Sequence, residues 1–151
     1  MHLLKKLRVI SLLGLCFSGA IHAQPSVQNT QMESTRMKMT INDKVFYFTP
    51  DDNVTAQAFL KKFPLSVEMD ELNGNEKKVD LPYSLPSKPV NPGMINAGDI
   101  MLYGDNTIVL FYKTFKTSYS YTRIGKVSTP SILENDATMK LNTVRVKFSR
   151  E

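Results

Sequence analysis

The stretch AGDIMLYGDNTIVLFYKTFKTSYSYTRIG, residues 97–125, decides the fold. It holds three apolar and aromatic runs, and these are punctuated by Gly98-Asp99, Gly104-Asp105-Asn106 and Lys116-Thr117. Such short spacing between strand-like runs is typical of antiparallel hairpins. We therefore expect three antiparallel strands here, with the rest of the chain packed around them.

The first 23 residues have the pattern of a cleaved signal peptide. A basic start is followed by an apolar run over residues 9–17 and by small residues that end at Ala23. The apolar run is shorter than the roughly 20 residues of a membrane-spanning helix. Cys16 offers the alternative of a lipid anchor, but it follows Leu15, where such signals usually carry a small side chain. We expect no membrane span, cleavage near Ala23, and export to the periplasm or out of the cell.

Cleavage at Ala23 would remove the single cysteine and both histidines, and would lower the net charge from +5 to +2. A serine–histidine–acid triad, a cysteine nucleophile and a His- or Cys-ligated metal site would then be excluded. No glycine-rich phosphate loop or dinucleotide fingerprint is present. We expect no metal and no cofactor, and the small net charge does not indicate nucleic acid as a partner.

The exported part reads as one domain. Residues 24–36 are polar and are expected to form a flexible leader, which leaves residues 37–151 as the domain. Alternating apolar and polar residues predict one hairpin over 37–48 and another around Asn73-Gly74. Between them, apolar residues at i, i+3, i+4 and i+7 predict a helix over 54–63.

The second half of the chain adds fewer local signals. Residues 82–98 carry four prolines, and we interpret them either as a functional loop or as a connection over one end of a barrel. A proline predicts a helical turn over 129–133, and alternation returns over 140–148. With about eight short strands, one helix and one helical turn, the sequence predicts a mainly β fold, a closed eight-stranded antiparallel barrel.

A series of short motifs also carries a family resemblance. In chain order they are Ala58-Phe59-Leu60, Phe63-Pro64, Asn73-Gly74-Asn75-Glu76, Leu81-Pro82, Ala97-Gly98-Asp99-Ile100, Leu110-Phe111-Tyr112-Lys113-Thr114, Ser118-Tyr119-Ser120-Tyr121 and Ile124-Gly125-Lys126. Together they resemble the bacterial cyclophilin-like domain family over roughly residues 37–148. The resemblance implies a cyclophilin-type barrel of eight strands, which agrees with the strand count.

The resemblance does not extend to the isomerase signature of cyclophilins. In that signature an arginine, a phenylalanine and a glutamine lead into Gly-Gly-Asp, but neither arginine nor glutamine precedes Gly98-Asp99 here. We therefore expect a binding module for a peptide or a small molecule. The alternative is a non-standard peptidyl-prolyl isomerase, because prolyl rotation needs only a donor that weakens amide conjugation, and Arg123 is the one arginine of the central stretch.

The candidate ligand site lies around Arg123. Strand alternation places Tyr119, Tyr121 and Arg123 on one face, where they can stack on a ligand and donate hydrogen bonds, with residues 82–98 completing the rim. Alternatively, these aromatic residues pack across strands and Arg123 pairs with an acid. Tyr103 and Phe115, at strand ends, are further rim candidates, although a structural role explains them as well.

Other residues are given structural interpretations. Tyr112 shares a face with Ile108 and Leu110, so we expect it in the core with its hydroxyl group hydrogen bonded. Five acids flank the Asn73-Gly74 turn and permit a carboxylate-pair hydrolase in principle. We interpret them as the solvated end of a hairpin. The five are Glu68, Asp70, Glu71, Glu76 and Asp80.

Overall fold

The computed structural model of the protein describes residues 36–151. The expected signal peptide over residues 1–23, Cys16 as an anchor, and the expected leader up to residue 35 lie outside the described residues, so they stay predictions. No helix within residues 36–151 is both long enough and apolar enough to cross a membrane.

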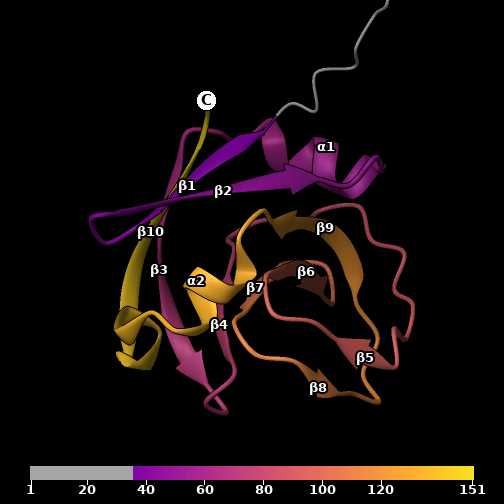
Figure 1. Cartoon of the computed structure of the whole chain (residues 1–151). Helices are drawn as coiled ribbons and strands as arrows, with labels where there is room; N and C mark the ends of the chain where they lie inside the picture. Colours follow the sequence, from indigo (N-terminus) through magenta and orange to yellow (C-terminus); the bar gives the residue numbers. More distant parts are fainter. Residues whose placement is uncertain (1–35) are drawn as a thin grey trace, which may run out of the picture. The chain divides into compact units, whose positions relative to one another are not determined.

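Eight strands close into an antiparallel barrel in the order β1-β10-β3-β4-β7-β6-β9-β2 (Figure 1). The predicted mainly β fold and eight-stranded barrel are confirmed. The barrel strands are β1 (Met37–Ile41), β2 (Lys44–Pro50), β3 (Leu65–Leu72), β4 (Glu76–Asp80), β6 (Asp99–Tyr103), β7 (Thr107–Phe111), β9 (Thr122–Val127) and β10 (Thr143–Arg150).

Three short helical segments accompany the barrel. They are α1 (Val54–Leu60), α2 (Pro130–Glu134) and the 3-10 helix η1 (Ala137–Lys140). The Asn53 side chain caps α1 by accepting a hydrogen bond from the amide of Ala56 at 2.8 Å. The helix ends three residues before the predicted end at residue 63, because the amides of Lys62 and Phe63 bond three residues back, which tightens the last turn.

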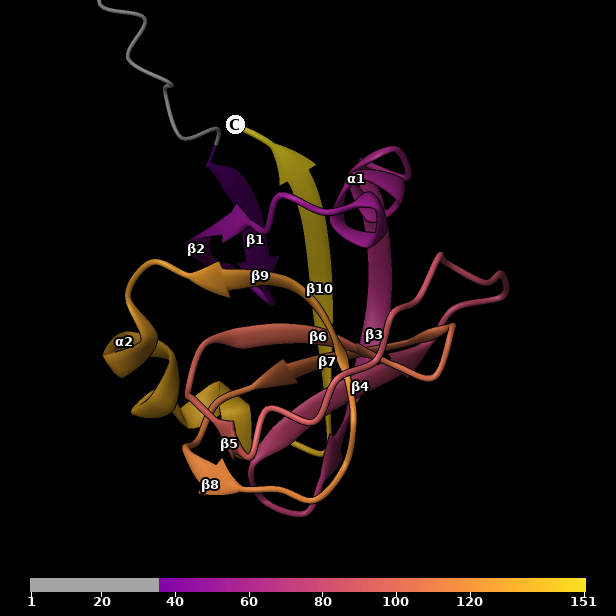
Figure 2. The same ribbon diagram turned by 90° about the vertical axis from the view of Figure 1, so that its right-hand side faces the viewer.

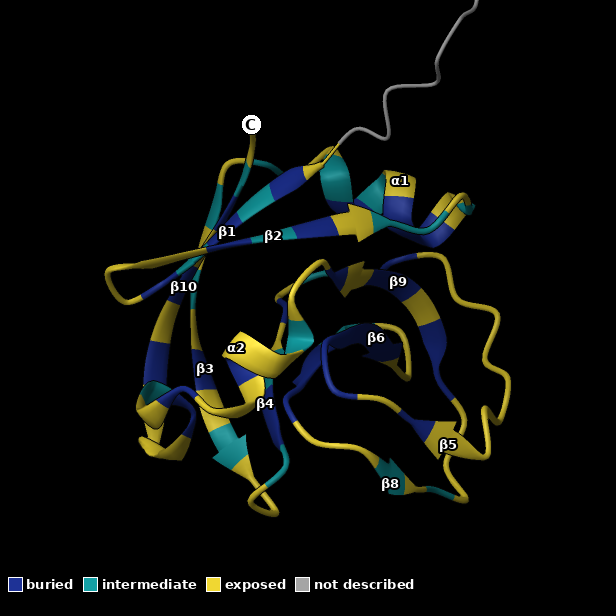
Figure 3. Cartoon of the chain, viewed as in Figure 1, coloured by how far each residue is buried: buried dark blue, intermediate teal, exposed yellow. Residues whose placement is uncertain are grey.

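Alternate residues of the strands fill the barrel interior. Met37, Met39 and Ile41 of β1 are fully buried, as are Val144 and the other inward residues of β10. Figure 3 shows this alternation as bands of buried and exposed residues along the strands. The rings of Phe59 from α1 and Phe148 from β10 meet edge to face with their centroids 5.2 Å apart, so α1 contributes to the same core.

Two segments cross the outside of the barrel, residues 82–98 and residues 112–121, which we call the outer layer. They carry the two-stranded sheet of β5 (Met94–Ile95) and β8 (Phe115–Lys116). Both views show this sheet beneath β6 and β7 (Figures 1 and 2). Outward side chains of the barrel are buried under it in a second apolar cluster. The cluster comprises Ile95, Met101, Val109, Phe111 and Tyr121.

The outer layer changes the topology of the central stretch. β6 and β7 pair as the predicted hairpin, but β9 pairs with β6 and not with β7. The difference arises because residues 112–121 leave the barrel, form β8 and return on the other side of β6. This excursion creates the groove described next.

Candidate functional site

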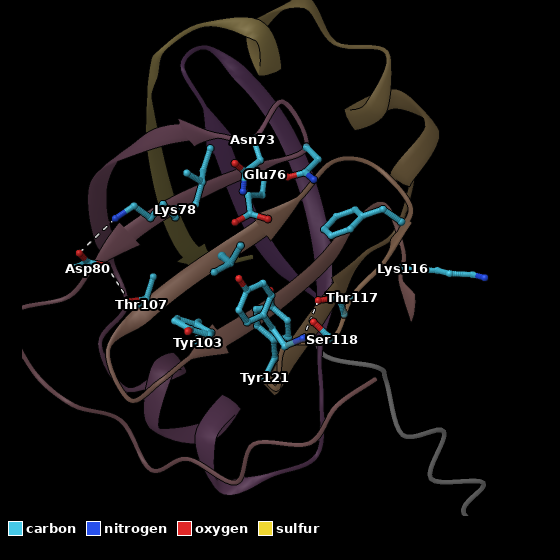
Figure 4. Close-up of a pocket in the computed structure, with 15 residues that line it drawn as sticks. Asn73, Glu76, Lys78, Asp80, Tyr103, Thr107, Lys116, Thr117, Ser118 and Tyr121 are labelled. Atoms are coloured by element: carbon cyan, nitrogen blue, oxygen red, sulfur yellow. Dashed lines mark hydrogen bonds and ion pairs between the residues drawn. The ribbon is translucent and has the colours of Figure 1, made fainter. Parts of the chain in front are cut away.

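A groove of about 550 Å³ lies on the outer face of the barrel, between β4 and the segment of residues 115–121. Glu76, Lys78 and Asp80 form one wall (Figure 4). They are alternate residues of β4 and therefore share its outer face. Thr107, Val109 and Tyr103 of β7 and β6 lie between the walls. The opposite wall is formed by residues of the segment 115–121, namely Phe115, Lys116, Thr117, Ser118, Tyr119 and Tyr121. Leu72, Asn73 and Asn75 complete the lining.

The turn from β3 to β4 sets the orientation of Glu76. Asn73 and Gly74 have φ angles of 58° and 69°, in the left-handed region that these two residue types favour in tight hairpin turns. The turn brings β4 back along β3 and into register with β7, so that Glu76 lies opposite Phe111. Directly paired residues share a face, so Glu76 lies on the outer face with the second apolar cluster.

Three tyrosines form an aromatic cluster in the groove. The ring of Tyr103 lies 6.1 Å from that of Tyr119 and 5.7 Å from that of Tyr121, between centroids. Tyr121 is only 8% exposed, whereas Tyr119 is 61% exposed. Phe115 packs on Phe111 at 5.7 Å. Four of the five predicted ligand-site residues, Tyr103, Phe115, Tyr119 and Tyr121, thus line one groove.

The structure does not bring Arg123 to these four residues. Its Nε atom donates to Oδ2 of Asp51 at 2.8 Å, and its backbone carbonyl accepts from Asn53, the cap of α1. Tyr121 and Thr122 are both buried, so the alternation expected from Tyr119 to Arg123 is broken where β9 begins. Arg123 does not line the groove, and neither does any residue of the segment 82–98, which instead supports β8 through β5.

Glu76 is the residue that sequence reasoning missed. The residue is only 8% exposed, and its carboxylate oxygens, which keep some contact with solvent in the groove, make no hydrogen bond or ion pair with any residue in the described range 36–151. Burial, reinforced by the negative charge of Glu71, raises its pKa to about 7. The predicted solvated hairpin end is therefore wrong for Glu76. The motif Asn73-Gly74-Asn75-Glu76 places an acid directly after the turn, but it carries no local sign that this acid is buried.

Asp80, at the other end of the same wall, is fully satisfied. The hydroxyl of Thr107 donates to its Oδ1 at 2.8 Å, and Nζ of Lys78 lies 3.4 Å from its Oδ2. The hydrogen bond from Thr107 lowers the pKa of Asp80 below its usual value, and Lys78 adds to this effect. The two carboxylates of the wall thus differ in electrostatic state, because only one of them has partners.

Lys77, between them in sequence, points to the barrel interior and is fully buried. Its Nζ atom lies 2.9 Å from Oε2 of Glu71 and also donates to the carbonyl of Leu141. The Tyr112 hydroxyl donates to the same Glu71 oxygen at 2.8 Å. Burial and this hydrogen bond raise the pKa of Tyr112. Tyr112 is therefore a core residue with a hydrogen-bonded hydroxyl, as predicted, whereas the solvated interpretation is also wrong for Glu71.

The groove supports binding through stacking, apolar contact and one carboxylate that changes its protonation near neutral pH. Among residues 36–151, no group of three or more His, Cys, Asp or Glu side chains is placed to hold a metal ion. The groove therefore combines aromatic rings, apolar surface and the Glu76 carboxylate.

Comparison with known proteins agrees with this architecture. None of the curated proteins compared matches the chain. The solution structure of the hypothetical protein AF2241 from Archaeoglobus fulgidus is similar, with a TM-score of 0.51 and 14% identity over 78% of this chain and 95% of that chain. At this identity the likeness bears on the fold alone. A sequence model described as the cyclophilin-like family matches residues 39–149. Because that match spans most of the chain, the protein belongs to the cyclophilin-like family.

Proposed function

We propose that this protein is an exported binding module that holds an extended peptide segment, or a small molecule, in the groove between β4 and residues 115–121. One observation carries the proposal: the groove combines an aromatic wall with a buried carboxylate, Glu76, that has no partner in the described part of the chain. The signal-peptide pattern of residues 1–23 supports export.

The dimensions of the groove suit a short extended peptide. From Glu76 to Asp80 the wall spans four residue steps, or about 13 Å, which is the length of roughly four extended residues. The groove volume of about 550 Å³ falls in the range of ordinary ligand sites. At one end, Oδ1 of Asn75 is buried without a hydrogen-bond partner among residues 36–151, so a polar group there is left for a ligand or a water molecule.

Isomerase activity has no comparable support. Arg123, the donor that this alternative requires, is paired with Asp51, and none of the residues that line the groove is an arginine. A donor aimed at the prolyl nitrogen would have to come from elsewhere. Binding without catalysis is therefore the function that the groove supports best.

The test is an NMR titration of the isotope-labelled protein with capped pentapeptides that vary in the central residue. We expect chemical-shift changes along β4 and residues 115–121, and weaker binding by a Tyr119→Ala variant. Tyr119 is largely exposed, so its truncation should leave the fold intact. Tyr47→Ala, which removes a tyrosine on β2 away from the groove, is the matched control. A folded protein that binds none of the peptides, or binds them away from these residues, would exclude the proposal.

A further inference from the structure

We infer that the groove selects peptide segments that present a lysine or arginine side chain to Glu76. The inference rests on the proposed peptide-binding function and specifies its ligand. It follows from the charges of the groove, among which only that of Glu76 belongs to a buried residue without a partner in the range 36–151.

The charged side chains that line the groove are Glu76, Lys78, Asp80 and Lys116. Lys78 and Asp80 pair with each other at 3.4 Å, and Asp80 also accepts from Thr107. Lys116 is exposed, and Figure 4 shows its side chain extending away from the groove. Only Glu76 is both buried and without a hydrogen bond or ion pair within residues 36–151. A buried carboxylate without a partner is unfavourable, so a cation that reaches it gains more than it would at an exposed acid.

Among residues 36–151, no lysine or arginine forms an ion pair with this carboxylate. Lys77 is the nearest in sequence, but its amine is held inside the barrel by Glu71 and by the carbonyl of Leu141. Lys78, two residues along the same face, is paired with Asp80. The described residues thus leave the place beside Glu76 open to a cation carried by the ligand.

The surroundings of Glu76 suit the long stem of a basic side chain. Figure 4 shows the carboxylate between Asn73 on one side and Tyr103 and Tyr121 on the other. The stem of a lysine, or the guanidinium plane of an arginine, can lie against the tyrosine rings while the charged end meets the carboxylate. A charged head on an apolar stem thus matches both halves of the site.

Protonation of Glu76 gives this recognition a pH dependence. Three titratable groups interact electrostatically with Glu76: Glu71 from β3, Tyr112 after β7 and Tyr121 before β9. Tyr103, Lys78 and Asp80 line the same groove. Burial, with the charge of Glu71, leaves Glu76 about half ionised near pH 7. A lysine amine stays protonated well above this range. The affinity for a lysine peptide therefore follows the ionised fraction of Glu76 and should be about tenfold higher at pH 8 than at pH 6.

The test uses three capped pentapeptides of sequence alanine, phenylalanine, X, phenylalanine, alanine, in which X is lysine, norleucine or glutamate. Dissociation constants are measured by calorimetry at pH 6 and pH 8. We expect the lysine peptide to bind about tenfold more tightly than the norleucine peptide at pH 8. This preference should disappear in Glu76→Gln and persist in Glu68→Gln, which removes an equal charge from an exposed position of β3.

The outcomes separate the two proposals. Equal binding of the lysine and norleucine peptides in the groove would overturn the charge selectivity and leave peptide binding intact. Tighter binding of all peptides at pH 6 would mean that Glu76 acts as a neutral donor, which also overturns the inference. If none of the peptides binds the folded protein, the proposed function fails as well. The pH dependence of the unsubstituted protein decides the matter even if Glu76→Gln folds poorly.

Discussion

Glu76 and Lys77 are neighbours on β4, both are buried and both are charged, yet the fold treats them differently. Lys77 points into the barrel, where Glu71 and a backbone carbonyl accept hydrogen bonds from its ammonium group. Glu76 points to the outer face, where the outer layer covers it and no described residue pairs with it. A single step along a strand, which reverses the side-chain direction, separates a structural charge from a poised one.

A buried charge that has all its partners supports the fold, whereas a buried charge without partners destabilises it and marks a candidate site. A buried ion pair is tolerated when geometry and hydrogen bonds are complete, as they are around Lys77. A buried carboxylate without partners costs stability and tends to become neutral, as its raised pKa indicates for Glu76. Such a cost is expected where a ligand supplies the missing partner. Four substitutions test this contrast.

The largest effect is expected for Lys77→Met. The change removes the cation but keeps the stem that fills the barrel, so Glu71 loses its ion partner and retains the hydrogen bonds from the Tyr112 hydroxyl and the Gly74 amide. We expect the free energy of unfolding to fall by about 3 kcal/mol, measured by urea denaturation at pH 7.5. Lys78→Met, which breaks a partly exposed pair, should cost less than about 1 kcal/mol. Equal losses would mean that burial of Lys77 is irrelevant.

Glu76→Gln should have the opposite sign. The pKa of Glu76 is about 7 in the folded protein against an ordinary value of 4.5, so the folded state binds the proton more tightly. Its contribution to stability is complete below pH 4.5 and is lost as the pH rises through 7. At pH 8 the variant should therefore be more stable by up to about 3 kcal/mol, and the gap should close towards pH 4.5.

Thermal and urea unfolding across this pH range provide the measurement for Glu76→Gln, with Glu68→Gln as the exposed control. A variant that is less stable than the unsubstituted protein at pH 8 would show that the carboxylate already has a partner. In that case the contrast with Lys77 would disappear.

Tyr112→Phe probes the side-chain hydrogen bond between Tyr112 and Glu71 in the Lys77 network. The substitution removes only the hydroxyl that donates to Glu71, and the ring stays in the core. We expect a loss of about 1 kcal/mol in the free energy of unfolding, the usual net value of such a bond. Tyr47→Phe, whose hydroxyl makes no hydrogen bond with residues 36–151, should change little. If the two variants lose the same stability, the hydrogen bond between Tyr112 and Glu71 does not contribute to the free energy of unfolding.

The smallest effect is expected for Arg123→Ala, which breaks an exposed pair with Asp51. Its cost should stay below about 1 kcal/mol in thermal unfolding. Because Arg123 does not line the groove, the dissociation constant of the lysine pentapeptide should not change. A large loss of binding by the folded variant would instead place Arg123 in the ligand site, as its sequence position suggested.

Local patterns in the sequence were sufficient for most of the barrel. Alternation identified β1, β2 and β10, and Asn73-Gly74 identified the turn between β3 and β4, because strand period and turn chemistry are properties of adjacent residues. The pairing of β9 with β6 was not accessible in this way. This pairing depends on the path of residues 112–121. The alternation within a strand does not determine which strand it pairs with.

The site, like the barrel, has features that the sequence predicts and features that only the tertiary structure decides. The sequence by itself determined the aromatic candidates Tyr103, Phe115, Tyr119 and Tyr121. Large aromatic rings near strand ends bury much of their surface by packing at the edge of a sheet, and this can be expected from their positions alone. Only the tertiary structure decided that Arg123 lies elsewhere and that Glu76 is buried. An acid beside a turn resembles any solvated acid until another segment covers it. Here that segment is the outer layer, which follows β4 and β7 in the chain, so the burial of Glu76, which is the larger cause of its raised pKa, arises from contacts distant in sequence.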